Sequence, residues 1–379
     1  MKVGLNLLHV RPEIGGGWNY IANILRVLPL LEKPFRFIAY CTSTSAAIVP
    51  NDDRFEIRIV NLGGSSQIMR VAFEQAVLPF LSHKDGVDCV HWFANSCSIF
   101  GIKPSIVTIH DFKSIEKPTN DIALKSLYMR QAVRFSCRQA NVIAPISEVS
   151  ADTAQRLFSV QKDRIVVVPN PIQSTFRPIP YENLSEFRNR LKLPPQFWLY
   201  VAHPYPHKNH IRLFEAYKRL LESEGSAWPL ILRGDGPKEK EELVNIALNL
   251  GIADSLTWIP RLSTEDMAKL YSSATALVFP SLYEGCGIPV LEAMACGCPL
   301  IASNILTTRE FAGDDMLTFD ATDVGSIARA MHQFALDRSL RTASTITGIQ
   351  RAEQYSPKNC VTKLSLAYHM SVQKRSQEC

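Results

Sequence analysis

The sequence of 379 residues lacks any long apolar run. A membrane-spanning helix requires about 18 or more consecutive apolar residues, and no stretch of that kind is present. The apolar N-terminus, residues 1–10, is short and is followed at once by Arg11, Pro12 and Glu13. We therefore interpret it as a buried first strand and not as a signal peptide, and we expect a cytoplasmic protein.

Cysteine pairs suited to a metal site or a disulfide framework are also missing. The nine cysteines are scattered, and only Cys296-Gly297-Cys298 brings two of them close together. Zinc sites usually need Cys-x-x-Cys pairs with a second cluster. The sequence has no Asp-x-Asp cluster either, and the adjacent pairs Asp52-Asp53 and Asp314-Asp315 are typical of solvated loops. We expect buried free thiols, no cofactor and no metal.

Charge is present in ordinary amount but is unevenly placed. Residues 1–175 contain 19 Lys and Arg against 14 Asp and Glu, a surplus of 5 that equals the net charge of +5 for the whole chain. The first half is therefore expected to meet something anionic. This surplus is small and no nucleic-acid-binding motif accompanies it, so a nucleic-acid partner is not expected.

Short apolar runs alternate with amphipathic stretches along both halves of the chain. Such alternation predicts an α/β fold with parallel sheets covered on both faces. Helices are expected at 21–28, 211–221 and 238–250. The apolar runs that we interpret as strands are Val3–Leu8, Phe35–Tyr40, Phe55–Val60, Cys89–Phe93, Ile106–Ile109, Val142–Pro145, Ile165–Val168, Trp198–Val201, Leu230–Leu232, Leu256–Ile259, Ala276–Phe279 and Pro299–Ile301.

A proline-rich stretch, residues 169–195, divides the chain near its middle. Prolines at this density favour extended connections. We therefore predict two doubly wound domains, residues 1–175 and 176–379. Ligands of such domains bind at the carboxyl ends of the parallel strands, so we expect a cleft where the two domains face each other.

The most informative segment, residues 281–297, follows one of these strands. Gly285 and Gly287 allow close approach of the backbone to a ligand, Pro289 suits the first turn of a helix, and Gly297 suits its end. A loop carrying Glu284 would thus enter a helix whose N-terminus favours phosphate, with Glu292 one turn inside it. Two carboxylates that hold hydroxyl groups on either side of a diphosphate would suit a nucleotide sugar.

This segment resembles the Glu-x7-Glu motif of the retaining glycosyltransferases of family 4, which have the GT-B fold. The resemblance implies that Glu292 binds the ribose of the donor and that Glu284 contacts the transferred sugar. The backbone at Cys286, Gly287 and Ile288 would meet the sugar and the diphosphate. The resemblance extends over residues 1–350, and it allows the C-terminal helix to pack back on the first domain.

Further segments resemble the donor site of that family. Residues 200–210 are similar to its basic diphosphate-binding turn, in which Lys208 would pair with phosphate. Many members have an arginine near Ala202, and this sequence has none, so His203, His207 or the backbone would have to compensate. Leu232-Arg233-Gly234-Asp235-Gly236-Pro237 resembles the Gly-x-Gly turn at the edge of the site. Arg261 corresponds to a position at a strand end, near the nucleotide base of the donor. It would either stack near that base or be an ordinary solvated arginine, and the sequence favours neither.

In the first half, Gly15-Gly16-Gly17 opens a helical pattern without the spacing of a nicotinamide-binding fingerprint. In the resembling family this glycine loop lies against the donor diphosphate and the acceptor, which assigns Gly16 and Gly17 to donor binding. His110 ends a predicted strand, and in related sequences with a His-Asp pair this histidine touches the donor sugar. A simple turn and a structural histidine are the alternatives.

Arg130, Arg134 and Arg138 recur every fourth residue and would share one helical face. Such a face can lie on an anionic membrane, which would place the protein at the inner surface of the membrane, although an ordinary solvated face has the same pattern.

The resemblance implies a retaining glycosyltransferase with Glu284, His110 and Lys208 at the reaction centre, and the lack of an Asp-x-Asp cluster predicts that no metal is needed. Residues 206–210 together with residues 109–111 look like bacterial mannosyltransferases of surface polysaccharide synthesis. The donor is therefore expected to be GDP-mannose, with UDP-glucose, UDP-GlcNAc or another nucleotide hexose as alternatives. The acceptor would be a glycan or a lipid-linked glycan in polysaccharide synthesis, such as that of lipopolysaccharide. A nucleotide-sugar epimerase and an inactive partner subunit are the alternatives from other classes.

Overall fold

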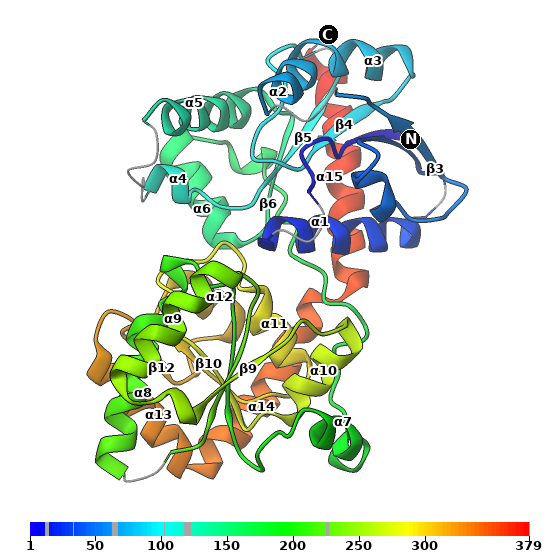
Figure 1. The fold of residues 1–379 in the computed structure, drawn as a ribbon. Coiled ribbons are helices and arrows are strands. Elements are labelled where there is room, and N and C mark those ends of the chain that lie inside the picture. The colour runs from blue at the N-terminus through cyan, green and yellow to red at the C-terminus, as the bar shows by residue number, and fades with distance from the viewer. Residues whose placement is uncertain are drawn as a thin grey trace. The chain divides into compact units, whose positions relative to one another are not determined.

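In the computed structural model, the described part of the chain comprises residues 1–11, 15–32, 34–62, 67–101, 103–116, 123–224 and 227–378. The chain forms two compact units (Figure 1). The first contains Met1–Pro171 and Pro357–Cys379, and the second contains Ile172–Ser356. Each unit is a parallel sheet of six strands with helices packed on it. The α/β prediction and its two Rossmann-like domains are therefore confirmed.

The first unit has the strand order β3-β2-β1-β4-β5-β6. Its strands are β1 (Lys2–Asn6), β2 (Arg36–Cys41), β3 (Phe55–Ile59), β4 (Cys89–Trp92), β5 (Ser105–Ile109) and β6 (Val142–Pro145). Its helices are α1 (Gly15–Val27), α2 (Gln67–Ala76), α3 (Leu78–Lys84), α4 (Lys113–Glu116), α5 (Ala123–Gln139), α6 (Glu148–Phe158) and α15 (Pro357–Glu378).

The second unit has the order β12-β11-β10-β7-β8-β9, which is the same winding, counted from its own first strand. Its strands are β7 (Trp198–Val201), β8 (Leu230–Arg233), β9 (Leu256–Ile259), β10 (Ala276–Phe279), β11 (Leu300–Ser303) and β12 (Thr318–Phe319). Its helices are α7 (Ser185–Arg190), α8 (His210–Glu224), α9 (Pro237–Leu250), α10 (Thr264–Ser273), α11 (Ile288–Ala295), α12 (Leu306–Ala312), α13 (Val324–Leu336) and α14 (Arg338–Ala352).

One expected strand is wrong. Residues 165–168 run beside β6, and the amides of Val166 and Val168 donate to the carbonyls of Ile143 and Pro145. Only an isolated bridge results. Pro145 has no N–H to donate, so the ladder is not reinforced there. The short strand β12 was not expected, because two residues are too few to show a periodic pattern.

The C-terminal helix α15 belongs to the first unit, so this unit is built from two separate stretches of the chain. The helix contacts β4, β5 and β6. Its Tyr368 is fully buried, and the hydroxyl lies 3.1 Å from Nδ1 of His91 on β4. The predicted boundary at 175/176 lies close to the observed one at 171/172. Residues 357–379, which the predicted division placed in the second domain, return to the first unit, as the resemblance allowed.

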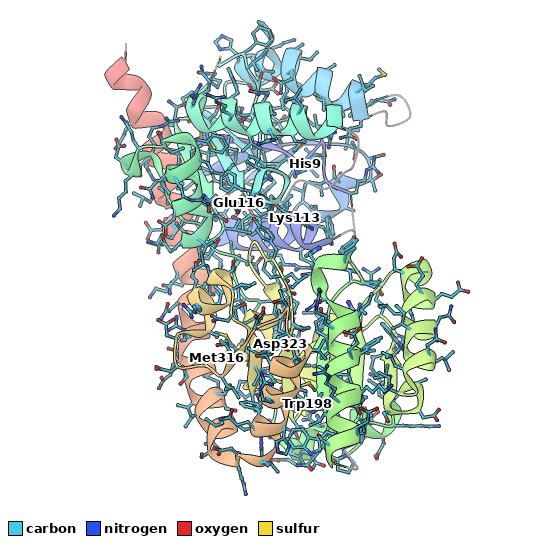
Figure 2. All side chains as sticks on the ribbon, turned by 90° about the vertical axis from the view of Figure 1, so that its left-hand side faces the viewer. His9, Lys113, Glu116, Trp198, Met316 and Asp323 are labelled. Atoms are coloured by element: carbon cyan, nitrogen blue, oxygen red, sulfur yellow. The ribbon has the colours of Figure 1, made fainter. Side chains whose placement is uncertain are left out.

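A wide aromatic core supports the second sheet. Trp198 on β7, which is labelled in Figure 2, is fully buried, and its ring lies 5.2 Å from that of Trp228 and 6.3 Å from that of Phe334. Burying a large side chain of this kind contributes about 2–3 kcal/mol. This packing fixes β7 in the middle of the sheet and so fixes the turn that follows it.

Candidate functional site

The second sheet reverses its direction of winding between β7 and β10. From β7 the chain proceeds outward through β8 to β9, whereas β10, β11 and β12 lie on the other side. In open parallel sheets, ligands bind at the carboxyl ends of the two strands that flank such a reversal. The segments that leave these two ends are the turn 202–209 and the loop 280–287, and both were assigned to the donor from the sequence.

The basic turn after β7 is tied to the loop after β10. A short 3-10 helix, Pro206–Lys208, ends at Asn209, which has a left-handed backbone with φ of 63°. Asparagine tolerates that conformation well. The Asn209 side-chain amide donates to the carbonyls of Pro280 at 3.1 Å and Ala321 at 2.7 Å. These bonds hold the turn in one position against the neighbouring loop.

Lys208 and Glu284 meet at this reversal point. The ammonium of Lys208 lies 2.6 Å from a carboxylate oxygen of Glu284, and the side chains are only 15% and 8% exposed. The backbone carbonyl of Glu284 also accepts a hydrogen bond from the Thr307 hydroxyl at 2.9 Å. The site thus contains a cation suited to phosphate and a carboxylate suited to sugar hydroxyls, each held in place.

Helix α11 begins where the glycine loop was expected to enter a helix. Gly287 is its N-cap, with a left-handed φ of 62°, and Pro289 lies in its first turn. The helix ends before Gly297, which has a φ of 70°, so the predicted start and end are both confirmed. Among the described residues, the amides of Gly287 and Ile288 form no hydrogen bond, which leaves two donors for an anion at this helix terminus.

Glu292 lies one turn inside α11, and its carboxylate accepts a hydrogen bond of 2.9 Å from the hydroxyl of Tyr271 on α10. Burial raises the pKa of Glu292 to about 7, although the bond from Tyr271 and the attraction of Arg233 act in the opposite direction. The carboxyl therefore titrates near neutrality. Sequence reasoning assigned Glu292 but missed Tyr271, since nothing in an amphipathic helix marks one tyrosine as the partner of a distant carboxylate.

The turn after β8 lies very close to the segment after β7. A Cβ on Gly234 would stand 1.8 Å from the carbonyl oxygen of Ala202, so only glycine fits there. Nδ1 of His203 donates to the carbonyl of Asp235 at 3.0 Å. The Gly-Asp-Gly-Pro segment is thus required by close backbone packing. Arg261 follows the edge strand β9 and is exposed.

The first sheet reverses its winding between β1 and β4, and His110 leaves the neighbouring strand β5. Nε2 of His110 lies 2.7 Å from the carbonyl oxygen of Phe93, and its ring packs edge-on against Tyr20. A carbonyl only accepts, so Nε2 carries the proton and Nδ1 is the acceptor nitrogen of the neutral ring. Burial lowers the pKa of His110, which favours this neutral form.

The glycines that were expected to form a loop before α1 are instead its first turn, because α1 begins at Gly15. Free amides are still expected at this end of the helix. A Cβ on Gly17 would lie 3.9 Å from Cε1 of His110, so Gly17 and His110 are close neighbours. Gly16 lies in the same turn, and the preceding residues 12–14 are outside the described part of the chain.

Another histidine at this edge was missed from the sequence. His9 follows β1 and is labelled in Figure 2. Burial lowers its pKa to about 3, so this ring is also neutral. The available signal was a histidine three positions beyond the strand and six positions before a glycine run.

Comparison with known proteins identifies the family of the chain. A model described as Glycosyl transferases group 1 matches residues 183–351, and one described as Glycosyltransferase Family 4 matches residues 14–176. The O-antigen chain mannosyltransferase B of Escherichia coli is 32% identical over 273 residues, which are 71% of this chain and 71% of that protein. The chain belongs to the family 4 glycosyltransferases.

Two further similarities concern this glycosyltransferase. The serotype-specific mannosyltransferase WbdA of Escherichia coli is 29% identical over 228 residues, which are 59% of this chain but 28% of WbdA. The crystal structure of Anabaena HepE in complex with UDP-glucose matches with a TM-score of 0.76 at 15% identity. It covers 97% of this chain and 99% of that one, which supports the GT-B fold.

The glycosyltransferase presents its basic helical face as expected. Arg130, Arg134 and Arg138 on α5 are all exposed. The described residues contain no helix that is long and apolar enough to cross a membrane. Contact of α5 with a membrane surface therefore stays a prediction.

The cysteines of the glycosyltransferase, and the side chains that could bind a metal ion, were also located. The eight cysteines of the described chain are free and buried. In the same part of the chain, no three side chains of His, Cys, Asp or Glu are grouped so that they could hold a metal ion.

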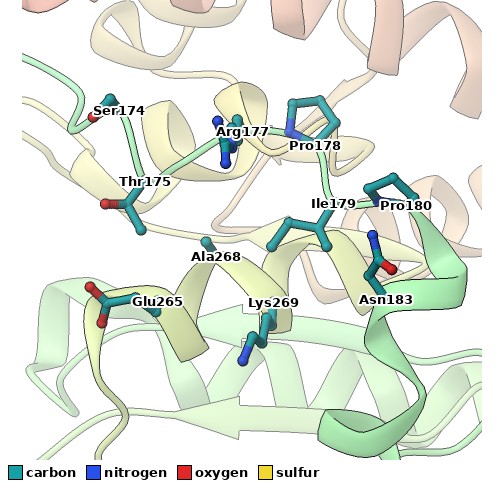
Figure 3. A pocket seen from close by; sticks show the side chains of 10 residues that line it. All are labelled: Ser174, Thr175, Arg177, Pro178, Ile179, Pro180, Asn183, Glu265, Ala268 and Lys269. Carbon is teal, nitrogen blue, oxygen red and sulfur yellow. The ribbon is translucent and has the colours of Figure 1, made fainter.

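A separate cavity of about 500 Å³ lies between residues 174–183 and α10 (Figure 3). Arg177, Glu265 and Lys269 contribute its charged side chains. None of the assigned donor residues lines this cavity.

Proposed function

We propose that this glycosyltransferase transfers a hexose, best assigned as mannose from GDP-mannose, to a glycan or a lipid-linked glycan in polysaccharide biosynthesis. The proposal is that anomeric configuration is retained and that no metal is needed. The observation that carries it is the pairing of Lys208 with Glu284 at the reversal point of the second sheet, beside the N-terminus of α11 and Glu292.

Each part of a nucleotide sugar has a counterpart in this arrangement. The ammonium of Lys208 and the amides of Gly287 and Ile288 suit the diphosphate, because a point charge and a helix N-terminus both stabilise phosphate. Glu292 suits the ribose hydroxyls, and Glu284 suits hydroxyls of the sugar. In the absence of donor, Lys208 and Glu284 neutralise each other. When the donor binds, each would exchange this contact for its own part of the ligand.

The reaction then needs little from the protein beyond positioning and charge stabilisation. The bond between the sugar C1 and the diphosphate oxygen breaks, and a bond from the acceptor oxygen to C1 forms on the same face. The acceptor proton passes to the departing phosphate. Lys208 stabilises the charge that develops on that phosphate. In the first unit, the acceptor nitrogen Nδ1 of neutral His110 is suited to hold a sugar hydroxyl.

Mannose is favoured by the relatives that bear that name. Both Escherichia coli proteins named above are mannosyltransferases, and one of them acts on the O-antigen chain. The second candidate is a UDP-glucose or UDP-GlcNAc donor, and HepE, which has the same fold, was solved in complex with UDP-glucose. We also propose that the exposed arginines of α5 bring the enzyme to the anionic inner face of a membrane when the acceptor is lipid-linked.

The test is a transfer reaction with purified enzyme. GDP-mannose, UDP-glucose, UDP-GlcNAc and ADP-glucose are offered in parallel, each with a glycan acceptor, with and without EDTA. The product linkage is read by NMR. We expect GDP-mannose to be the preferred donor, the product to keep the α configuration of the donor, and EDTA to have no effect. A β-linked product would contradict retention, loss of activity in EDTA would contradict metal independence, and preference for a UDP-sugar would contradict the mannose assignment.

A further inference from the structure

The donor diphosphate requires more positive charge than Lys208 alone supplies. A diphosphate bridging two sugars carries two negative charges, and the ammonium of Lys208 is already paired with Glu284. The segment after β7 contains no arginine near Ala202. His203, a candidate substitute, uses its ring to hold the carbonyl of Asp235. A second cation at this edge, beside Lys208 and the amides of α11, would have to come from a different strand.

Arg233 occupies that place. It is the last residue of β8 and pairs with Val201, the last residue of β7, in the parallel ladder. The amide of Ala202 donates to the carbonyl of Arg233 at 2.9 Å. The backbone of Arg233 therefore lies directly beside Ala202, near which this sequence has no arginine. Both residues are at the carboxyl edge of the sheet, and Lys208 extends from the same edge.

The surroundings of the Arg233 side chain suit a ligand better than a structural role. The side chain is only 12% exposed, and its Nε is buried and has no hydrogen-bond partner among the described residues. In the same part of the chain it forms an ion pair with Asp235 at 3.3 Å, and the Asp235 side chain is 43% exposed. A buried donor without a partner costs about 1–3 kcal/mol. An exposed carboxylate at this distance compensates little of that cost.

The turn that follows Arg233 packs tightly against the segment after β7. Gly234 is pressed against the carbonyl of Ala202, and a Cβ on Gly236 would stand 2.9 Å from the ring of Pro204. Arg233 also exerts an attraction on the carboxyl of Glu292. Arg233 thus adjoins the basic segment through the β7–β8 ladder and acts electrostatically on the carboxylate assigned to the ribose, and the diphosphate of a bound donor would adjoin both.

We propose that Arg233 binds the donor diphosphate and supplies the guanidinium that is absent near Ala202, exchanging Asp235 for phosphate oxygens when the donor binds. This inference rests on the proposed nucleotide-sugar donor. The unpaired Nε and one terminal nitrogen form a planar fork that matches two phosphate oxygens, which a lysine cannot reproduce.

The test compares Arg233→Met, Arg233→Lys and Asp235→Asn. Calorimetry measures the affinity of each for GDP, UDP and ADP, and competition with the best of these measures the affinity for its parent nucleoside. Circular dichroism and thermal unfolding establish that each variant is folded. We expect Arg233→Met to weaken nucleoside diphosphate binding at least ~30-fold, and Arg233→Lys to lie between it and the wild type. Nucleoside binding should change less than threefold, and Asp235→Asn should bind as tightly as the wild type or more tightly.

Comparison of Arg233→Met with Asp235→Asn distinguishes a role of Arg233 in ligand binding from a structural role of the ion pair. If Asp235→Asn weakened binding as much as Arg233→Met, the pair would be structural and the inference would be overturned. An equal loss for the nucleoside would overturn it too, because Arg233 would then act on the ribose through Glu292. Should the wild type bind none of the three nucleoside diphosphates, the proposed donor class would itself be wrong. Tight binding by the wild type with unchanged binding by Arg233→Met would refute only the role of Arg233.

Discussion

The ammonium of Lys208 lies 2.6 Å from the carboxylate of Glu284, although the two residues are 76 positions apart in the chain. One follows β7 and the other follows β10, the two strands that flank the reversal of the second sheet. Winding order, more than sequence proximity, brings them together. The pair is also poorly solvated, with exposed fractions of 15% and 8%. Because both charges are largely buried, removing either one should change the free energy of unfolding by a measurable amount.

Removing one member of the pair should destabilise the protein. Lys208→Ala leaves the buried carboxylate of Glu284 without its cation, which is expected to cost roughly 3 kcal/mol. The double variant Lys208→Ala, Glu284→Ala should cost less than the sum of the two single variants. Urea unfolding measures these differences. Lys218→Ala is the matched control, because Lys218 pairs with Glu222 in an exposed position and should cost under ~0.5 kcal/mol. Additive losses at 208 and 284 would show that the two charges do not stabilise each other.

The pH dependence of donor binding should report on Glu292. Burial raises the pKa of Glu292 to about 7, so in the free enzyme the carboxyl gains and loses its proton in the neutral pH range. Ribose hydroxyls donate best to the ionised form, so nucleotide affinity is expected to rise between pH 6 and pH 8, with release of a proton on binding. Glu292→Gln should weaken binding and abolish this rise. Tyr271→Phe removes a hydrogen bond to the carboxylate, so its binding curve should shift to higher pH. A pH-independent affinity in the wild type would contradict the assignment.

The raised pKa of Glu292 also affects the stability of the fold. Stability should fall as the pH rises, whereas donor affinity should increase. A carboxyl whose pKa is higher in the folded state than in the unfolded state stabilises the fold when it is protonated. The contribution of Glu292 is therefore complete below its unfolded pKa and is lost as the pH rises through about 7. Thermal unfolding without donor should show Glu292→Gln gaining on the wild type from pH 5 to pH 8. A constant difference between the two proteins would mean that Glu292 is ionised throughout.

Two glycines of the donor site should respond differently to alanine. Gly234→Ala places a Cβ 1.8 Å from a backbone oxygen, which cannot move away easily, and should cost at least ~3 kcal/mol. Gly287→Ala meets no atom closer than 3.8 Å, so only its left-handed φ of 62° opposes the change, at about 1 kcal/mol. Chemical denaturation compares the two. Equal losses would mean that the turn after β8 relaxes more readily than its packing indicates.

His110 is expected to affect turnover more than donor affinity. Replacing it with alanine removes one hydrogen bond to a sugar hydroxyl, worth about 1–3 kcal/mol, so kcat should fall by roughly ten- to a hundredfold. Binding of the nucleoside diphosphate alone should be unchanged. His369→Ala is the control, since His369 is exposed on α15 and its ring binds the carbonyl of Ser365 in the same helix. If His110→Ala had normal turnover, His110 would have only a structural role, through its hydrogen bond to the carbonyl of Phe93.

Most of the fold could be predicted from the sequence, because buried parallel strands and amphipathic helices have distinct periodicities. The segment Glu284 to Glu292 was also predictable, since glycine, proline and carboxylate positions define a loop that enters a helix. What could not be predicted depends on contacts between separate strands. Arg233 lies beside Ala202 only through the ladder of β7 and β8, and Tyr271 reaches Glu292 from another helix. The resemblance allowed α15 to return to the first unit, but its individual contacts were not predictable, since Tyr368 meets His91 across 277 positions of the chain.

The most direct test of the central claim is calorimetric titration of GDP-mannose and of GDP into the wild type, Glu292→Ala and Glu284→Ala, with turnover measured on the same samples. The account predicts that Glu292→Ala weakens binding of both ligands at least ~10-fold, because the ribose contact is common to both. Glu284→Ala should leave GDP binding within about twofold of the wild type and lower kcat, because its contact is to the sugar. Wild-type affinity and turnover in both variants would contradict the placement of the donor site at the reversal point of the second sheet.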